Sequence, residues 1–235
     1  MDIFKKILQL FPDWVVYFVG FVYGLTRFKK SYAQYGEDLI LDNYFKYKKI
    51  NKGVYVDIGC YHPVWISNTY IFHKKGWLGY AIDIDKRKIA YYKLMRGTKC
   101  MVKWAALVAE GIDHGKTQIV YKFKRPYSSI DTVDKETADR YSKNINEKYV
   151  VEHVPKISVC DYFSTMNKVN LLNIDIEGID EDVLMNVDLH VLDPDAIVFE
   201  NNNDKGGSDT VKRYLVGMGY KLLFISGGSV CYAKY

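Results

Sequence analysis

The chain has few cysteines, and their spacing matches no metal-binding or disulfide pattern. The 235 residues contain four, Cys60, Cys100, Cys160 and Cys231, which are far apart and include no C-x-x-C pair. This spacing argues against both a zinc cluster and a disulfide framework. It fits a reducing compartment, so we expect a cytoplasmic protein.

Loops and surfaces that bind phosphate groups are also missing. The sequence has no G-x-x-x-x-G-K-[ST] motif, which excludes the common class of nucleoside triphosphatases. The net charge of +5 comes largely from dispersed lysines, and no basic groove with interleaved aromatic residues is present. We therefore expect no nucleic-acid partner.

The apolar run at 14–25 is too short for an ordinary membrane-spanning helix. It has about a dozen apolar or aromatic residues, whereas a bilayer requires ~20, and Pro12-Asp13 interrupts any extension. No small-residue cleavage site follows, so a removable signal peptide is a poor fit. Basic residues flank the run on both sides: Lys5, Lys6, Arg27, Lys29 and Lys30.

Three alternatives stay open for this N-terminal segment, residues 1–30. In the first, it lies at the inner face of a membrane, with its aromatic residues buried and its lysines facing anionic headgroups. In the second, it packs on its own domain or on a second copy of the chain, as in a homodimer. A true membrane span is the third alternative.

Predicted strands and helices alternate over short connections in residues 31–235. Strands are expected from 54 and at 79–84, 100–104, 117–124, 169–174, 196–199, 220–225 and 229–233, and helices at 31–47, 71–75, 86–95, 161–166, 180–187 and 208–218. This pattern predicts an α/β fold, a mostly parallel sheet with helices on both faces. Gly227-Gly228 predicts a closing antiparallel hairpin. Such an ending is typical of S-adenosylmethionine-dependent methyltransferase sheets and not of ordinary dinucleotide-binding folds.

Residues 111–155 interrupt this alternation. They contain a predicted strand, the turn Arg125-Pro126 and a highly charged segment at 134–148. We expect the charged segment to be a solvated surface helix. The position also suits a lid inserted over a binding site.

Two strand ends predict a nucleoside-binding site. Asp57 and Gly59 follow the first strand, and Asp83 ends the second strand ~26 residues later, where ribose hydroxyls are bound in nucleoside-binding folds. The glycine lets the backbone approach a ligand closely. Because Cys60-Tyr-His-Pro63 replaces the glycines that seat a pyrophosphate, the pattern favours a cofactor without phosphates, such as S-adenosylmethionine, over NAD.

A second group of acids follows the strand 169–174. Asp175 and Glu177 precede Gly178, and such carboxylates can accept a proton from a substrate hydroxyl. With Glu200, at the next strand end, they could also hold a hard divalent cation. The structural alternative is that they cap the following helix. His62, directly after the first strand turn, is either a further general base or an exposed loop histidine.

Several motifs, in this order, together resemble the FkbM-type S-adenosylmethionine-dependent methyltransferases. They are Gln34-Tyr-Gly-Glu-Asp38, Val54-Tyr-Val-Asp-Ile-Gly-Cys-Tyr-His-Pro63, Ser67-Asn-Thr69, Gly76-Trp-Leu-Gly-Tyr-Ala-Ile-Asp83 and Asn173-Ile-Asp-Ile-Glu-Gly178. The resemblance implies a class I, Rossmann-like methyltransferase fold and methyl transfer to oxygen. One departure is Asp83-Ile84, where many members have Glu-Pro.

The resemblance also implies roles for individual residues. Asp57 and Gly59 would approach the methionine part of the cofactor, and Asp83 would hold the ribose hydroxyls. Asp175 and Glu177 would lie on the acceptor side. Residues near the adenine, or in polar contact with the cofactor, would be Ala105, Ala106, Ser67, Asn68 and Gln34.

The leading functional hypothesis is an O-methyltransferase for a hydroxyl of a sugar, in a polysaccharide or a sugar nucleotide. The catalytic residues would be Asp175, Glu177 and His62. One alternative is a polyketide or lipid-linked acceptor. The other is a membrane-associated binding protein that has this fold but catalyses no reaction.

Overall fold

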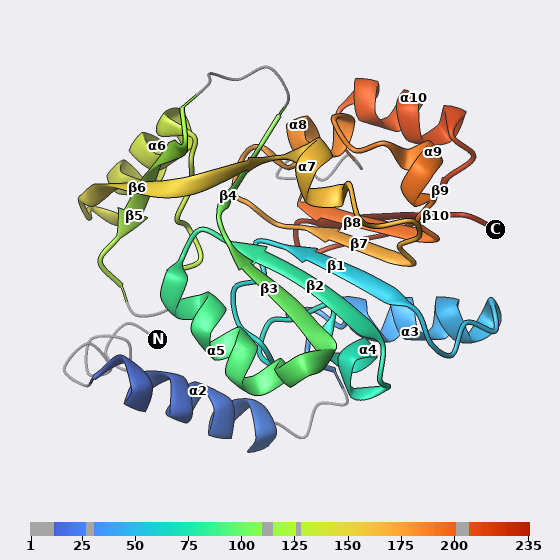
Figure 1. The fold of residues 1–235 in the computed structure, drawn as a ribbon, viewed down its shortest axis with the longest axis horizontal. Coiled ribbons are helices and arrows are strands. Elements are labelled where there is room, and N and C mark those ends of the chain that lie inside the picture. Colours follow the sequence, from blue (N-terminus) through green and yellow to red (C-terminus); the bar gives the residue numbers. More distant parts are fainter. Residues whose placement is uncertain (1–11, 27–30, 110–114, 126–127, 201–206) are drawn as a thin grey trace.

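A seven-stranded sheet and a smaller three-stranded sheet form the framework of the protein (Figure 1). The computed structural model describes residues 12–26, 31–109, 115–125, 128–200 and 207–235. Within these ranges, none of the helices combines the length and the apolar character that crossing a membrane would demand.

The large sheet has the strand order β3-β2-β1-β7-β8-β10-β9. Its strands are β1 (Val54–Ile58), β2 (Leu78–Asp83), β3 (Cys100–Trp104), β7 (Leu171–Ile174), β8 (Ala196–Glu200), β9 (Lys221–Ser226) and β10 (Ser229–Ala233). The first five are parallel to one another, whereas β10 is antiparallel to both β8 and β9. This arrangement confirms the predicted mostly parallel sheet with a closing antiparallel hairpin.

The strand order reverses between β1 and β7, because the chain leaves β1 towards β2 and leaves β7 towards β8. In open α/β sheets, a ligand crevice forms at such a reversal, beyond the carboxyl ends of the strands. Residues of β1 and β7 are almost wholly buried, as expected for parallel strands that helices cover on both faces. The topology therefore places the ends of β1 and β7 at the candidate site.

Helices cover both faces of the large sheet (Figure 1). On one face lie α3 (Glu37–Tyr47), α4 (Tyr70–Lys74) and α5 (Lys86–Arg96), and on the other α7 (Val159–Phe163), α8 (Asp180–Met185), α9 (Leu189–Leu192) and α10 (Asp209–Gly217). Each set has its own hydrophobic core: Phe45, Phe72 and Trp77 belong to the first, and Val183, Leu215 and Val56 to the second. Successive residues of β1 point to opposite faces, so Tyr55 joins the first core and Val56 the second.

The helix expected at 31–47 begins six residues later than predicted, at Glu37. Gly36, in the left-handed region at φ +97°, precedes the helix. The Ser31 hydroxyl and the Tyr32 amide both donate to the Asp38 carboxylate. Because these bonds turn residues 31–36 back onto the first turn of the helix, this segment cannot continue it.

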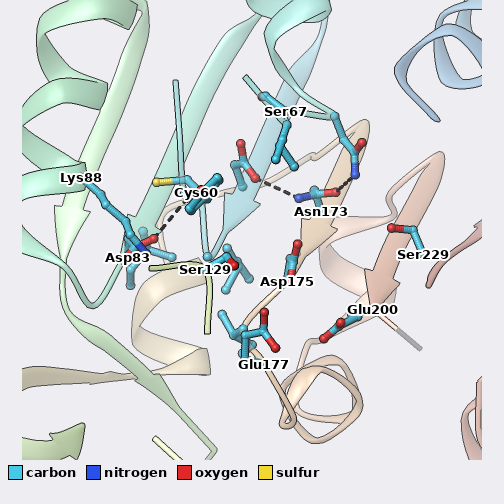
Figure 2. A pocket seen from close by; sticks show the side chains of 18 of the residues that line it. Cys60, Ser67, Asp83, Lys88, Ser129, Asn173, Asp175, Glu177, Glu200 and Ser229 are labelled. Carbon is cyan, nitrogen blue, oxygen red and sulfur yellow. Dashed lines mark hydrogen bonds between the residues drawn. The ribbon is translucent and has the colours of Figure 1, made fainter. Parts of the chain in front are cut away.

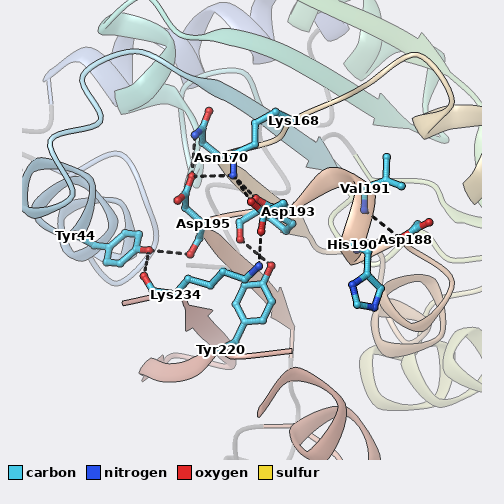
Figure 3. Close-up of polar contacts among 11 residues, drawn as sticks. Tyr44, Lys168, Asn170, Asp188, His190, Val191, Asp193, Asp195, Tyr220 and Lys234 are labelled. Atoms are coloured by element: carbon cyan, nitrogen blue, oxygen red, sulfur yellow. Dashed lines mark hydrogen bonds and ion pairs between the residues drawn. The ribbon is translucent and has the colours of Figure 1, made fainter. Parts of the chain in front are cut away.

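Polar contacts close the sheet at the amino ends of β7 and β8, away from the cavity (Figure 3). The Tyr44 hydroxyl donates to the carbonyl oxygens of Asp195 and Lys234, at 2.9 and 2.6 Å. The Asn170 side-chain amide donates to the Asp195 carboxylate. These bonds join α3 to the segments that precede β8 and follow β10.

The described parts of residues 106–158 form the second sheet, of order β4-β6-β5, and a helix. The elements are β4 (Ala106–Val108), β5 (Thr117–Phe123), α6 (Lys135–Ile145) and β6 (Tyr149–Ser158). The strand β5 and the charged helix were expected, whereas β4 and the ten-residue β6 were not. We call 115–158 the insertion segment. That it acts as a lid stays a prediction.

The N-terminal apolar run forms α2 (Asp13–Thr26). Val16 and Tyr17 are buried, and the Tyr17 ring stacks on Tyr91 of α5 with centroids 3.6 Å apart. The Asp13 carboxylate pairs with Arg87 at 2.8 Å. One face of α2 thus packs on its own domain.

The turn after β1 lies against the end of β7. Gly59 has φ +74°, and a Cβ atom built on it would be 1.7 Å from the Asp175 carbonyl oxygen. The Asp175 amide also donates to the Ile58 carbonyl. Gly59 is therefore required by contact within the protein, in addition to any close approach by a ligand.

We predict that Gly59→Ala lowers the free energy of unfolding by about 3 kcal/mol, because it adds both a backbone clash and an unfavourable φ. Gly219→Ala is the control, since Gly219 has φ +84° but open space around its Cβ position, and it should cost about 1 kcal/mol. Urea unfolding of both variants measures the difference. Equal losses of unfolding free energy in the two variants would contradict a backbone clash at Gly59.

Candidate functional site

A cavity of about 270 Å³ opens at the carboxyl ends of β1, β2, β7 and β8. The segment before α3, the insertion segment and the β9–β10 turn complete its walls. Figure 2 shows Asp83 and Lys88 on one side of this cavity and Asp175, Glu177 and Glu200 on the other. The cavity therefore lies at the reversal of strand order.

Most of the residues predicted from the sequence line this cavity. They are Gln34, Asp57, Gly59, Ser67, Asn68, Asp83, Ala105, Asp175 and Glu177, together with Glu200. Two others, Ala106 and His62, are not part of the described lining. The structure thus brings together candidates from seven separate stretches of the chain.

His62 fits neither of its two predicted roles. The side chain is fully buried, so it is no exposed loop histidine, and it lies outside the described lining of the cavity. Its Nδ1 atom accepts hydrogen bonds from the amides of Val64 and Trp65, at 3.1 and 2.9 Å. Burial, and then the charge of Arg96, lowers its pKa to about 4. We therefore assign His62 to holding the turn after β1.

Asp57 is the centre of a buried hydrogen-bond network. Its Oδ2 atom accepts from the hydroxyls of Thr69 and Tyr92, both at 2.5 Å. Its Oδ1 atom accepts from the Asn173 amide at 2.9 Å, and Asn173 in turn accepts from the Asn68 amide. The carboxylate thereby joins β1, β7, α5 and the segment before α4.

Arg96 supplies the positive charge that balances Asp57. Its guanidinium is buried and donates to the hydroxyls of Ser67 and Thr69, at 2.9 and 3.2 Å. The Thr69 hydroxyl, which accepts from Arg96, also donates to Asp57, so it relays between the two charges. Buried charges of opposite sign, bridged by satisfied donors, avoid most of the penalty for leaving water.

Asp83 shares its side of the cavity with a buried lysine, Lys88. The Asp83 carboxylate accepts from the amides of Tyr61 and Asp85, at 3.2 and 2.7 Å. The pKa of Asp83 is raised, because burial outweighs the opposing effect of the Lys88 charge. Burial lowers the pKa of Lys88, but Asp83 and then Asp131 outweigh this and raise it. Lys88 therefore stays cationic and favours an ionised Asp83.

The acids on the other side of the cavity repel one another. Carboxylate oxygens of Asp175, Glu177 and Glu200 lie within 4.8 Å of each other. Enclosure by the cavity walls raises the pKa of Asp175 well above its usual value, and Asp180, Glu177 and Glu200 add to the shift. Burial and then Glu200 raise the pKa of Glu177 to about 8. One of these groups is therefore poised to change protonation near neutral pH.

The insertion segment holds Glu177 in place. The Tyr141 hydroxyl donates to the Glu177 carboxylate, and the Thr132 hydroxyl donates to the Glu177 carbonyl at 2.8 Å. Glu177 has φ +56°, an uncommon conformation for a residue with a side chain. These two bonds stabilise it and aim the carboxylate at the cavity.

The alternative that Asp175 and Glu177 cap the next helix is wrong. Ile179 occupies the cap position of α8, where no side chain makes a capping bond. The nearby Asp180 carboxylate accepts from the Ile176 amide instead. Asp175 and Glu177 are therefore available to a ligand.

The carboxylate oxygens of Asp175, Glu177 and Glu200 lie close enough together to bind a hard divalent cation. Glu177 already accepts a hydrogen bond from Tyr141. The raised pKa values of Asp175 and Glu177 also favour protonation, which would reduce the repulsion between the carboxylates. A divalent metal at this site stays a prediction.

The described lining of the cavity carries seven carboxylate side chains and a single lysine, Lys88. Such a surface favours a cation and repels phosphate groups. The structure therefore agrees with the sequence-based preference for a cofactor without phosphates.

The chain belongs to the FkbM methyltransferase family, because the family described as "Methyltransferase FkbM domain" matches residues 57–222. This confirms the predicted family and makes S-adenosylmethionine the implied methyl donor. Among solved structures, a TehB-like SAM-dependent methyltransferase from Corynebacterium glutamicum ATCC 13032 is similar, with 13% identity and a TM-score of 0.43 over 86% of this chain and 89% of that chain. No match was found among curated proteins.

Several residues of the site were not predicted. Thr69 and Asn173 lie within two of the motifs that resemble the family, Ser67-Asn-Thr69 and Asn173-Ile-Asp-Ile-Glu-Gly178, so their position in the sequence was a usable signal. Arg96, Lys88 and Tyr141 lie on helices, where a charged or tyrosine side chain is usually solvated. Only the packing of these helices on the sheet and on Glu177 shows that they belong to the site.

We predict that Asp57→Ala lowers the free energy of unfolding by about 3 kcal/mol, because it leaves Arg96 without its balancing charge. In a chain of this size the melting temperature should fall by about 10 °C. Asp209→Ala is the matched control, since that side chain is 90% exposed, and it should change little. A melting temperature unaltered by Asp57→Ala would contradict the network.

Proposed function

We propose that the protein is an S-adenosylmethionine-dependent O-methyltransferase whose acceptor is a hydroxyl of a sugar in a glycan. Membership of the methyltransferase family supports the reaction class. The observation that carries the proposal is the division of the cavity. Asp83 and Lys88 form one side, and a cluster of carboxylates with raised pKa values forms the other.

The residues on the first side fit S-adenosylmethionine. Asp83 offers its carboxyl oxygens, beside the cationic Lys88, to the two ribose hydroxyls. The apolar side chains of Ile84, Ala105 and Leu107 offer a surface for the adenine. The negative lining suits a sulfonium cation. When bound, this cofactor supplies a methyl group on positively charged sulfur, which is an electrophile that needs no further activation.

The carboxylates on the second side fit a general base. A sugar hydroxyl is weakly acidic, so its oxygen becomes a better nucleophile as its proton is removed. We assign this proton to the Asp175–Glu177 pair. The Asp175 side chain is open to the cavity, and the Glu177 carboxylate, with a pKa of about 8, can take up a proton near neutral pH. The remaining rate enhancement would come from the alignment of the acceptor oxygen with the methyl donor by the cavity walls.

The charge of the cavity bears on which sugar acceptor it takes. A sugar nucleotide would bring a diphosphate towards Asp175, Glu177 and Glu200, which are all acidic. A neutral glycan would bring only hydroxyl groups, which readily donate hydrogen bonds to carboxylates. We therefore favour an uncharged saccharide over a sugar nucleotide. A polyketide or lipid-linked acceptor is the second candidate.

We predict saturable binding of S-adenosylmethionine, and none of NAD, in separate calorimetric titrations. Asp83→Asn should weaken the binding of S-adenosylmethionine about 10- to 100-fold, because a charge-assisted hydrogen bond contributes about 1.5–3 kcal/mol. Asp209→Asn, on the exposed start of α10, should bind like the wild type. Unchanged affinity in Asp83→Asn would show that the ribose is held elsewhere. Binding of neither cofactor would favour a protein without turnover.

We predict that methyl transfer to neutral oligosaccharides rises with pH, reaches half of its maximum near pH 8 and levels off above that pH. Only the ionised carboxylate can accept the proton, and its raised pKa leaves it largely protonated at lower pH. Transfer from radiolabelled S-adenosylmethionine measures the profile. Glu177→Gln should lower the rate about 100-fold or more. Full activity in both Glu177→Gln and Asp175→Asn would contradict the assignment of the general base to this pair.

Tyr141→Phe gives a sharper test of the same base. The Tyr141 hydrogen bond lowers the pKa of Glu177, so its loss should move the profile towards higher pH. Tyr149→Phe, which removes an exposed bond to Asp139, should leave the profile in place. Each assay is repeated with EDTA and then with added Mg²⁺. Loss and recovery of activity would show that a cation joins the carboxylates.

A further inference from the structure

We propose that the outward face of α2 docks on an anionic lipid bilayer. The helix has two unlike faces. Val16 and Tyr17 are buried against the domain, whereas Trp14, Phe18 and Val22 are 65%, 59% and 40% exposed. These three residues are spaced four apart, so they form one stripe along the helix.

The helix is held firmly enough to present this stripe. Tyr17 stacks on Tyr91 at 3.6 Å, and Asp13 pairs with Arg87 at 2.8 Å. Both partners lie on α5, which α2 follows along the outside of the molecule (Figure 1). The exposed stripe therefore faces away from the domain.

The charges around the helix favour an anionic surface. Asp13 is the only acidic residue of α2, and Arg87 neutralises it. The sequence on either side of the helix contributes five basic residues, Lys5, Lys6, Arg27, Lys29 and Lys30, against one further acid, Asp2. An apolar, aromatic helix face with basic flanks is the pattern of helices that lie in a membrane interface.

The size of the stripe favours a bilayer over a second copy of the chain. A stable protein–protein interface buries about 800 Å² on each partner. Three side chains on a helix about 21 Å long supply less than this. A bilayer has no such requirement, because aromatic side chains enter the headgroup region one at a time and basic residues add to the affinity. The helix is also too short to span.

Docking by α2 would bring the catalytic cavity near the membrane. A small cleft between α2 and α5 is lined by Asp13, Tyr17 and Lys88, and Lys88 also lines the main cavity. The helix thus lies beside the cofactor side of the site. If the proposed function holds, the acceptor is a saccharide displayed at a membrane surface. The docking itself does not depend on that function.

Flotation with lipid vesicles tests the proposal. The protein should float with phosphatidylcholine vesicles that contain about a quarter phosphatidylglycerol, and much less with phosphatidylcholine alone. Raising the salt concentration from about 0.1 to about 0.5 M should weaken the binding. Trp14→Ser/Phe18→Ser should reduce the affinity at least about tenfold. Because both side chains are exposed, its melting temperature should stay close to that of the wild type.

Val191→Ser/Val216→Ser is the matched control, since these side chains are 56% and 62% exposed on helices elsewhere, and it should float like the wild type. Failure of the wild-type protein to float, or equal flotation of the Trp14/Phe18 variant, would overturn the proposal. So would a dimer in light scattering that this variant abolishes, because the stripe would then bind a second copy. Calorimetry with S-adenosylmethionine, done on the same variant, separates loss of docking from loss of cofactor binding.

Discussion

The buried carboxylate of Asp57 is the interaction on which the rest of the site depends. Three donors, Thr69, Tyr92 and Asn173, converge on it from different parts of the chain, and Arg96 balances its charge through the Thr69 hydroxyl. A buried charge with this many partners tolerates few alternative arrangements. It therefore fixes the helices beside β1 and the end of β7 relative to one another. The cavity exists because these elements meet there.

Much of the large sheet could be predicted from the sequence, because its strands are short, apolar and separated by helices with clear ends. The second sheet could not. β6 contains Glu152, His153 and Lys156 and shows no alternation of buried and exposed residues. It forms because β4 and β5 pair with both of its edges. Such pairing arises only in the folded chain, so it cannot be predicted from a local pattern in the sequence. The late start of α3 has a similar cause, since Asp38 binds the residues before the helix.

The candidate site shows the same division. Residues at strand ends, such as Asp57, Asp83 and Asp175, were predictable because topology alone places strand ends at one edge. His62 was misplaced because adjacency in sequence says little about which way a turn points a side chain. Lys88 and Tyr141 were missed because their partners lie far away in the chain. Gly59 had the expected position, but the Asp175 carbonyl, which explains the glycine, lies 116 residues further on.

The two bonds from the insertion segment to Glu177 limit how this enzyme scaffold can be re-engineered. A chimera that exchanged residues 117–158 for the matching part of another methyltransferase would keep Asp83 and Lys88 but would replace Asp131, whose charge acts on both. It would lose the hydroxyls of Thr132 and Tyr141 unless the grafted segment restored both. The position of Glu177 therefore depends on the insertion segment as well as on β7. Ser129 and Val133 line the cavity from the same segment, so they can be changed without removing either of the hydroxyls that hold Glu177.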